Sequence, residues 1–398
     1  EIDRTLAPDL IQQAVLALYH HHDALRLRFS HTAAGWQQYL PSLPGNDTQD
    51  IYQVIDLAHL PSASQQPTLV MINRELQASL QLVEGPLLRV AWLDFGSKQP
   101  ARLLIIIHHL AIDWVSWRIL ISDLWTGYEQ LAQHQPVQLP AKTSSFKQWT
   151  TWLTEYAHSQ TLLAELDHWL TLTTQSISPL PVDFAGQDHR NTVASADLVM
   201  CSLSVAETRR LLQDVPPVYH TQINDFLLTA LAQAFALWTG HPTLYLDLEG
   251  HGREELTETL DLSRTVGWFT SMFPVCLHLD SPDAGQAITS IKEQLRHIPR
   301  RGVGYGLLRY LNPETAAQLA ALSQAEIVFN YGGQFKVESM TDLGDEVAQA
   351  NHLGYLLHIN GAVINDQLSL SWVYSQNLYR RDTIERLAQS FISALQAL

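Results

Sequence analysis

The stretch from Leu103 to His109 constrains this chain most, because five consecutive aliphatic residues end abruptly in two histidines. An aliphatic run of this length is typical of a buried strand. Imidazoles at the end of such a strand are carried on a rigid scaffold, where catalytic groups are often found. From Trp117 to Leu131 apolar residues recur at steps of three and four, which predicts a helix with its apolar stripe against a sheet. The spacing places His109 in the loop between this strand and this helix.

Composition sets the outer limits of the interpretation. A chain of 398 residues is long enough for two or three domains, and a hydrophobic content of 46% can fill sizeable cores. The net charge of -16 and the absence of a lysine or arginine run argue against nucleic acid and anionic membranes as partners. Two cysteines cannot build a disulfide framework, so we expect a cytoplasmic protein. No segment approaches the roughly 18 apolar residues of a membrane span, and the first residues do not resemble a signal peptide.

The second half of the chain mixes strands with helices. Residues 243–249 alternate, with Leu244, Leu246 and Leu248 on one face, and residues 221–238 predict a helix that ends at Gly240. The mixture predicts an α/β class (an α+β sandwich) with two lobes, residues 1–178 and 179–398, divided at the irregular stretch 176–191. We further expect strands at 275–279, 326–331, 356–359 and 368–374, and helices at 284–297 and 381–397.

Three segments of the second half place polar or aromatic groups at predicted strand ends. They are Glu249-Gly250-His251-Gly252-Arg253-Glu254, Arg264-Thr265-Val266-Gly267-Trp268-Phe269-Thr270 and Phe329-Asn330-Tyr331-Gly332-Gly333-Gln334-Phe335. With the His-His-x-x-x-Asp-x-x-Ser-Trp pattern of residues 108–117, they resemble motifs of the epimerization domains of nonribosomal peptide synthetases, within the condensation-domain superfamily. Residues 304–308 fit the same pattern. The family's opening Pro-Ile-Gln motif is absent, so the chain looks truncated at its start.

The resemblance implies two lobes like chloramphenicol acetyltransferase, arranged as a V with a tunnel between them. It also implies epimerization of an aminoacyl or peptidyl thioester, from L to a mixture of L and D. The substrate would arrive on the 4'-phosphopantetheine of a carrier domain, and the domain itself would bind no cofactor. The expected partners are that carrier, upstream in the same polypeptide, and a downstream condensation domain, with the domain itself a monomer that serves antibiotic or other natural product biosynthesis. His109 and Glu249 match the catalytic positions, and Asn330 and Tyr331 match residues that line the site.

The chemistry of epimerization fits these residue types. One group must remove the α-proton and another must return a proton from the opposite face, and a histidine near its ordinary pKa can do either. A glutamate in a partly apolar site can have a raised pKa and act as an acid. The developing enolate oxygen requires a fixed hydrogen-bond donor, for which Tyr331, Asn330 and a backbone N–H are all candidates. The sequence leaves open which of His109 and Glu249 serves which face.

His108, Trp114 and Ser116 are further candidates for lining the site, although His108 and Ser116, like Asp113, are interpreted as mainly structural. We expect His108 to pack inward with its ring hydrogen bonded, and Asp113 to form an ion pair with Arg253 that ties the two lobes. Ser116 lies in a first helical turn and is expected to bond backbone rather than act as a nucleophile. Three consecutive histidines, residues 20–22, suggest zinc. We predict no metal site there, because adjacent residues on a helix point about 100° apart.

Two residues depart from the family pattern. Trp114 stands where the family has glycine, and Gly332 stands where it has leucine. A compensating exchange between two walls of the tunnel is one hypothesis. Two other functions stay open: a peptide-bond-forming condensation domain, which would use His109 without Glu249, and a catalytically inactive interaction module of the same fold.

Overall fold

The computed structural model describes residues 6–33, 35–41, 50–97, 99–172, 177–184, 191–337, 343–344 and 347–398. By its internal contacts the chain forms two compact units. Unit 1 contains Glu1–Trp152, Thr257–Phe269 and Ser339–Glu346, and unit 2 contains Leu153–Leu256, Thr270–Glu338 and Val347–Leu398. The lobes expected from the sequence, 1–178 and 179–398, are each continuous. Unit 1 instead ends its first segment at Trp152 and also includes Thr257–Phe269 and Ser339–Glu346 from the second half of the chain. Of the irregular stretch that suggested the boundary, residues 177–184 and 191 are described, and residues 176 and 185–190 lie outside the described residues.

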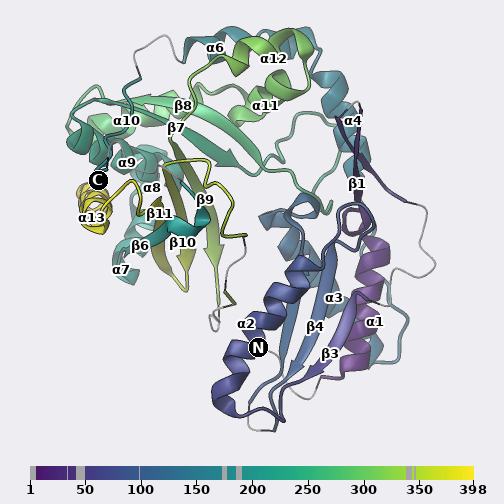
Figure 1. Ribbon diagram of the computed structural model, residues 1–398. Helices are drawn as coiled ribbons and strands as arrows, with labels where there is room; N and C mark the ends of the chain where they lie inside the picture. The colour runs from purple at the N-terminus through teal and green to yellow at the C-terminus, as the bar shows by residue number, and fades with distance from the viewer. Residues whose placement is uncertain are drawn as a thin grey trace. The chain divides into compact units, whose positions relative to one another are not determined.

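Unit 1 is built on a three-stranded sheet in the order β3–β4–β5, with helices on both faces (Figure 1). Strand β3 (Tyr52–Asp56) is parallel to β4 (Leu88–Asp94), and β4 is antiparallel to β5 (Arg102–Ile107). Helices α1 (Pro8–His21) and α3 (Trp114–Ala132) share a hydrophobic cluster with one face of the sheet, and α2 (Ser62–Ala78) shares another with the opposite face.

Burial on both faces explains the unbroken aliphatic run of β5. Leu103, Ile105 and Ile107 pack with the α1–α3 cluster, and Leu104 and Ile106 pack with the α2 cluster. A strand of this kind has no polar face, so it lacks the usual alternation. The smaller elements of unit 1 are the turn η1 (Asp23–Arg26), the hairpin β1 (Arg28–Thr32) and β2 (Gly35–Tyr39), and the turn η2 (His109–Ala111). Helix α4 (Phe146–Tyr156) begins in unit 1 and ends in unit 2.

Unit 2 contains a six-stranded sheet in the order β6–β11–β10–β9–β7–β8. The pairs β10–β9 and β9–β7 are parallel, and the remaining pairs are antiparallel. The strands are β6 (Ala196–Ser202), β7 (Thr243–Gly250), β8 (Ser271–His278), β9 (Ile327–Phe335), β10 (Leu357–Ile364) and β11 (Gln367–Ser375).

One face of this sheet carries the largest core of the molecule. Helices α9 (Ile223–Thr239), α10 (Ala284–Arg296) and α13 (Arg381–Ala397) contribute apolar residues to the cluster that this face forms. The shorter elements of unit 2 are α5 (Gln160–Leu163), α6 (Leu166–Thr171), η3 (Val193–Ser195), α7 (Val205–Arg209), η4 (Arg210–Asp214), α8 (Pro216–Tyr219), η5 (Pro299–Gly302), α11 (Val303–Tyr310) and α12 (Pro313–Ala320).

The predicted class is confirmed, since both units combine a sheet with packed helices. Gly240 ends α9 in the left-handed conformation, with φ of 75°, and its N–H donates to the carbonyl of Ala236 as a C-terminal cap does. Across the described residues, every helix is too short or too polar to cross a bilayer.

Candidate active site

The two histidines that follow β5 have different surroundings. The backbone N–H of His108 donates to the carbonyl of Leu87 (2.9 Å), and its Nδ1 accepts from the N–H of Leu110 (3.2 Å). Burial, and then the neighbouring His109, lowers the pKa of His108. A ring that accepts at Nδ1 and resists protonation is held as one neutral tautomer, which suits a structural role.

His109 opens the short turn η2 between β5 and α3, as the sequence predicts, and its side chain is exposed. Its ring lies against the indole of Trp268, with ring centroids 5.5 Å apart and an interplanar angle of 67°. Trp114, the first residue of α3, is 55% exposed. The part of unit 1 around His109 therefore presents one imidazole and two large aromatic rings to its surroundings.

Asp113 and Ser116 bind a distant part of the chain rather than facing solvent. Asp113 caps α3, with Oδ1 accepting from the N–H of Ser116 (2.7 Å), and its Oδ2 accepts from the N–H of Phe269 (3.2 Å). The Ser116 hydroxyl donates to the carbonyl of Gly267 (3.0 Å) and accepts from its N–H (3.1 Å). Ser116 is fully buried, so its contacts are those of an anchor and not of a nucleophile. The Asp113–Arg253 ion pair stays a prediction, because these residues belong to different units.

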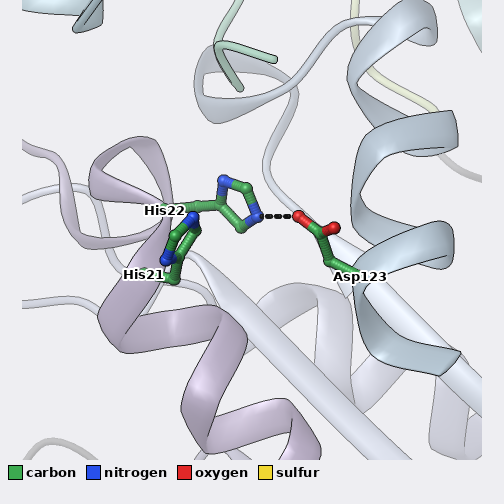
Figure 2. Close-up of side chains that lie close together, drawn as sticks. All are labelled: His21, His22 and Asp123. Atoms are coloured by element: carbon green, nitrogen blue, oxygen red, sulfur yellow. Dashed lines mark hydrogen bonds and ion pairs between the residues drawn. The ribbon is translucent and has the colours of Figure 1, made fainter. Parts of the chain in front are cut away.

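A buried ion network lies deeper in unit 1. In Figure 2 the Nε2 atom of His22 points at the carboxylate of Asp123 on α3, at 2.9 Å, with the ring of His21 beside it. Arg264 donates to the other oxygen of Asp123 (2.5 Å). Burial by itself raises the pKa of Asp123, but the hydrogen bond from His22 and the Arg264 cation outweigh it and hold the pKa below its usual value.

The rings of His21 and His22 lie together, so the prediction that they splay apart and therefore cannot share a zinc ion was wrong in its geometry. Helix α1 ends at His21, and His22 takes an extended conformation (φ -93°, ψ 108°), which brings the two rings close. Ligand atoms of His21, His22 and Asp123 lie within 4.8 Å of one another. Both oxygens of Asp123 are already engaged by His22 and Arg264, so we interpret the cluster as an ion network between α1, α3 and residues 257–269.

In unit 2, strand β7 presents its polar side chains on one face. Leu244, Leu246 and Leu248 enter the core, as the alternation predicts, so Asp247 and Glu249 lie on the opposite face. Asp247 pairs with Val328 and Leu248 with Phe329 in the parallel ladder to β9. Continuing that register by one residue places Asn330 beside Glu249 on the same face.

Tyr331 lies on the other side of this sheet. It is paired with Gly361 of β10, where a Cβ atom would lie 3.6 Å from the Tyr331 ring and 3.4 Å from the core residue Leu370. Tyr331 also packs against the hydrophobic core of unit 2, and burial raises the pKa of its hydroxyl. The strand therefore brings Asn330 to Glu249 and turns Tyr331 away from it.

Asp247 has a partner that sequence reasoning missed. Its Oδ2 accepts a hydrogen bond from the hydroxyl of Tyr355 (2.7 Å), which precedes β10. Burial raises the pKa of Asp247, although the bond from Tyr355 opposes the rise. Past the end of β7, Nδ1 of His251 accepts from the N–H of Arg253 (3.0 Å), a local contact within the segment that follows the strand.

The network around Asp123 was also missed, although the sequence carries a signal for it. Asp123 falls on the apolar stripe of α3, next to Leu124 and one turn from Leu120, and it is 1% exposed. A carboxylate on an apolar stripe needs a buried partner, since an unpaired buried charge is very costly. The identities of the partners, His22 and Arg264, depend on segments far apart in the sequence.

The comparisons with known proteins agree with the motifs. A linear gramicidin synthase from Brevibacillus parabrevis is 45% identical over 403 residues, covering 98% of this chain and 5% of the relative. Tyrocidine synthase 1 from the same organism is 36% identical over 98% of this chain and 37% of its own length. The chain thus spans a small part of the curated relatives that it matches.

Two solved structures match this chain to different degrees. The epimerization domain from the third module of tyrocidine synthetase B matches with a TM-score of 0.90 and 35% identity, over 98% of this chain and 88% of that one. The SgcC5 protein from Streptomyces globisporus matches with a TM-score of 0.72 and 16% identity, which shows the fold alone. The condensation domain family model matches residues 1–398. The chain belongs to the condensation domain family, and the sequence-based identification of an epimerization-type member of that superfamily is confirmed.

Proposed function

We propose that this chain catalyses epimerization at the α-carbon of an aminoacyl or peptidyl thioester. The observation that carries the proposal is the contrast between the epimerization domain of tyrocidine synthetase B, at 35% identity, and SgcC5, at 16%. The substrate arrives on the phosphopantetheine arm of a carrier domain, and the domain needs no cofactor of its own. Carrier and condensation domains of the same assembly line, in the cytoplasm, are the proposed partners.

The proposed mechanism uses His109 and Glu249 on opposite faces of one α-carbon. One of them removes the proton and the other returns one, while the thioester delocalises the carbanion. A positioned acid or base of this kind contributes roughly 10²- to 10⁴-fold. Glu249 is supported by its place on the polar face of β7, beside Asn330, whose amide N–H can donate to the enolate oxygen. Tyr331 is the weaker donor candidate, because it packs on the core side of the sheet.

The decisive assay supplies an L-aminoacyl or L-peptidyl carrier protein in deuterated water. Release of the product and measurement of its chirality and α-deuterium report each proton removal. We expect a mixture of L and D products with deuterium in both. Retention of pure L product without deuterium contradicts the proposal. Formation of a dipeptidyl thioester, when an acceptor carrier is added, indicates the alternative condensation activity.

Trp114 and Gly332 are proposed to be coupled substitutions, a large side chain at one wall of the site and a small one at another. Trp114→Gly, Gly332→Leu and the double variant form a cycle that tests this. We expect the double variant to be more active than the two single effects predict together. Strictly additive effects on turnover contradict the coupling.

A further inference from the structure

Residues 257–269, which we call the crossing segment, belong to unit 1 although the chain on both sides of them belongs to unit 2. The last part of this segment is fixed to the start of α3. Ser116 both donates to and accepts from the backbone of Gly267, and Asp113 accepts from the N–H of Phe269. The acidic and hydroxyl residues of the motif thus hold a segment from the second half of the chain on the helix that follows His109.

Packing leaves one outward-facing side chain at the end of the crossing segment. Val266 and Phe269 are buried, and a Cβ atom at Gly267 would lie 2.5 Å from the ring of Phe146. Trp268 is 43% exposed, and its indole meets the ring of His109 edge to face. Hydrogen bonds and core packing hold the residues on both sides of Trp268. The backbone of Trp268 is therefore fixed, and its indole contacts the histidine from a defined position.

We propose that Trp268 is a positioning residue, which orients the imidazole of His109 for proton transfer. An exposed histidine on a short turn has free rotation about χ1 and χ2, and proton transfer requires one orientation of the ring. The edge-to-face contact favours one rotamer, and the hydrogen bonds of Asp113 and Ser116 fix the indole that makes it. This inference rests on the proposed function of His109 and adds the residue that orients its ring.

Unit 1 contains a matched control for this pair. Trp36 on β2 meets His31 on β1 with ring centroids 5.2 Å apart and the same interplanar angle of 67°. Trp36 is 65% exposed and lies on the hairpin, away from the motif residues in the sequence. Removal of either indole deletes an exposed tryptophan with an edge-to-face histidine contact, so a general effect of such a deletion appears in both variants.

The test compares the intact chain with Trp268→Ala, Trp268→Phe and Trp36→Ala in the deuterium exchange assay. We expect Trp268→Ala to lower kcat about 2- to 10-fold with little change in KM for the carrier substrate, in line with the modest strength of an aromatic pair. Trp268→Phe should recover most of the loss, and Trp36→Ala should match the wild type. A rise in KM at unchanged kcat shows that Trp268 is only a wall of the substrate site and overturns the proposal.

A second measurement separates this inference from the proposed function. Side-chain ¹⁵N spectra of His109, assigned with His109→Gln, report its tautomer and its rotamer exchange without any substrate. We expect Trp268→Ala to change these signals, Trp268→Phe to restore them in large part, and Trp36→Ala to leave them alone. Unchanged His109 signals in Trp268→Ala overturn the positioning role. If the wild type shows no epimerase activity while Trp268→Ala still changes the His109 signals, the epimerase assignment is overturned and the contact between Trp268 and His109 is still supported as a positioning contact.

Discussion

The two regions proposed to carry the chemistry are built by different means. Around His109, polar side chains of α3 bind the crossing segment, whose residues lie some 150 positions later in the sequence. Around Glu249, the alternation of one strand and its register with β9 decide which side chains share a face. The first arrangement depends on long-range hydrogen bonds, and the second depends mainly on local periodicity. Substitutions should therefore damage folding more easily in the first region than in the second.

The largest expected effect concerns the chemistry itself. His109→Ala and Glu249→Gln should each lower the rate of α-deuterium exchange by roughly 10²- to 10⁴-fold, because each removes an acid or base from one face of the α-carbon. Both side chains are at least partly exposed, so the thermal midpoint should stay close to that of the wild type. His31→Ala, which deletes an exposed histidine of the hairpin, is the control and should remain active. Activity that survives in both catalytic variants refutes the assigned roles.

Next in size is the ion network of unit 1. Asp123→Asn leaves Arg264 and His22 facing a neutral amide, and we expect a loss of about 3 kcal/mol in the free energy of unfolding at pH 7. The pKa of Asp123 is lowered in the folded state, so its stabilising contribution is present above the unfolded pKa and disappears as pH falls through the folded value. Chemical denaturation of both proteins at pH 7 and pH 3 measures this. A difference that does not shrink in acid contradicts the network.

These two regions also show what a sequence can predict. Leu244, Leu246 and Leu248 fall on the core face of β7 as their spacing indicates, because strand alternation is a local property. Tyr331 was expected to line the site, and its place on the core side depends on the pairing of β9 with β7 and β10, which no local pattern specifies. The partners of Ser116 and Asp123 lie more than 100 residues away along the chain, and no periodicity specifies them. Helix α1 ends at His21, but the extended backbone of His22, which brings the two rings together, has no signal in the helical spacing.

The anchor of the crossing segment gives a smaller effect. Ser116→Ala leaves the buried N–H and carbonyl of Gly267 without their hydroxyl partner, and we expect a loss of about 1–3 kcal/mol in the free energy of unfolding. Thr126 is the matched control, because its hydroxyl donates to a carbonyl within the exposed part of the same helix. Thr126→Ala should change stability by less than about 0.5 kcal/mol. Equal losses in the two variants would contradict an anchoring role for Ser116.

The smallest expected effect lies beside Glu249. Tyr355→Phe removes the hydroxyl that donates to Asp247, and we expect a loss of about 1 kcal/mol at pH 7. Burial already raises the pKa of Asp247, and loss of this donor should raise it further, because the hydrogen bond favours the ionised carboxylate. The stability difference between wild type and variant should therefore be greatest where Asp247 is ionised and should diminish as pH falls and the carboxyl is protonated in both. Unfolding curves recorded between pH 4 and pH 8 measure that trend, and a difference that grows in acid would mean that Tyr355 binds the protonated form instead.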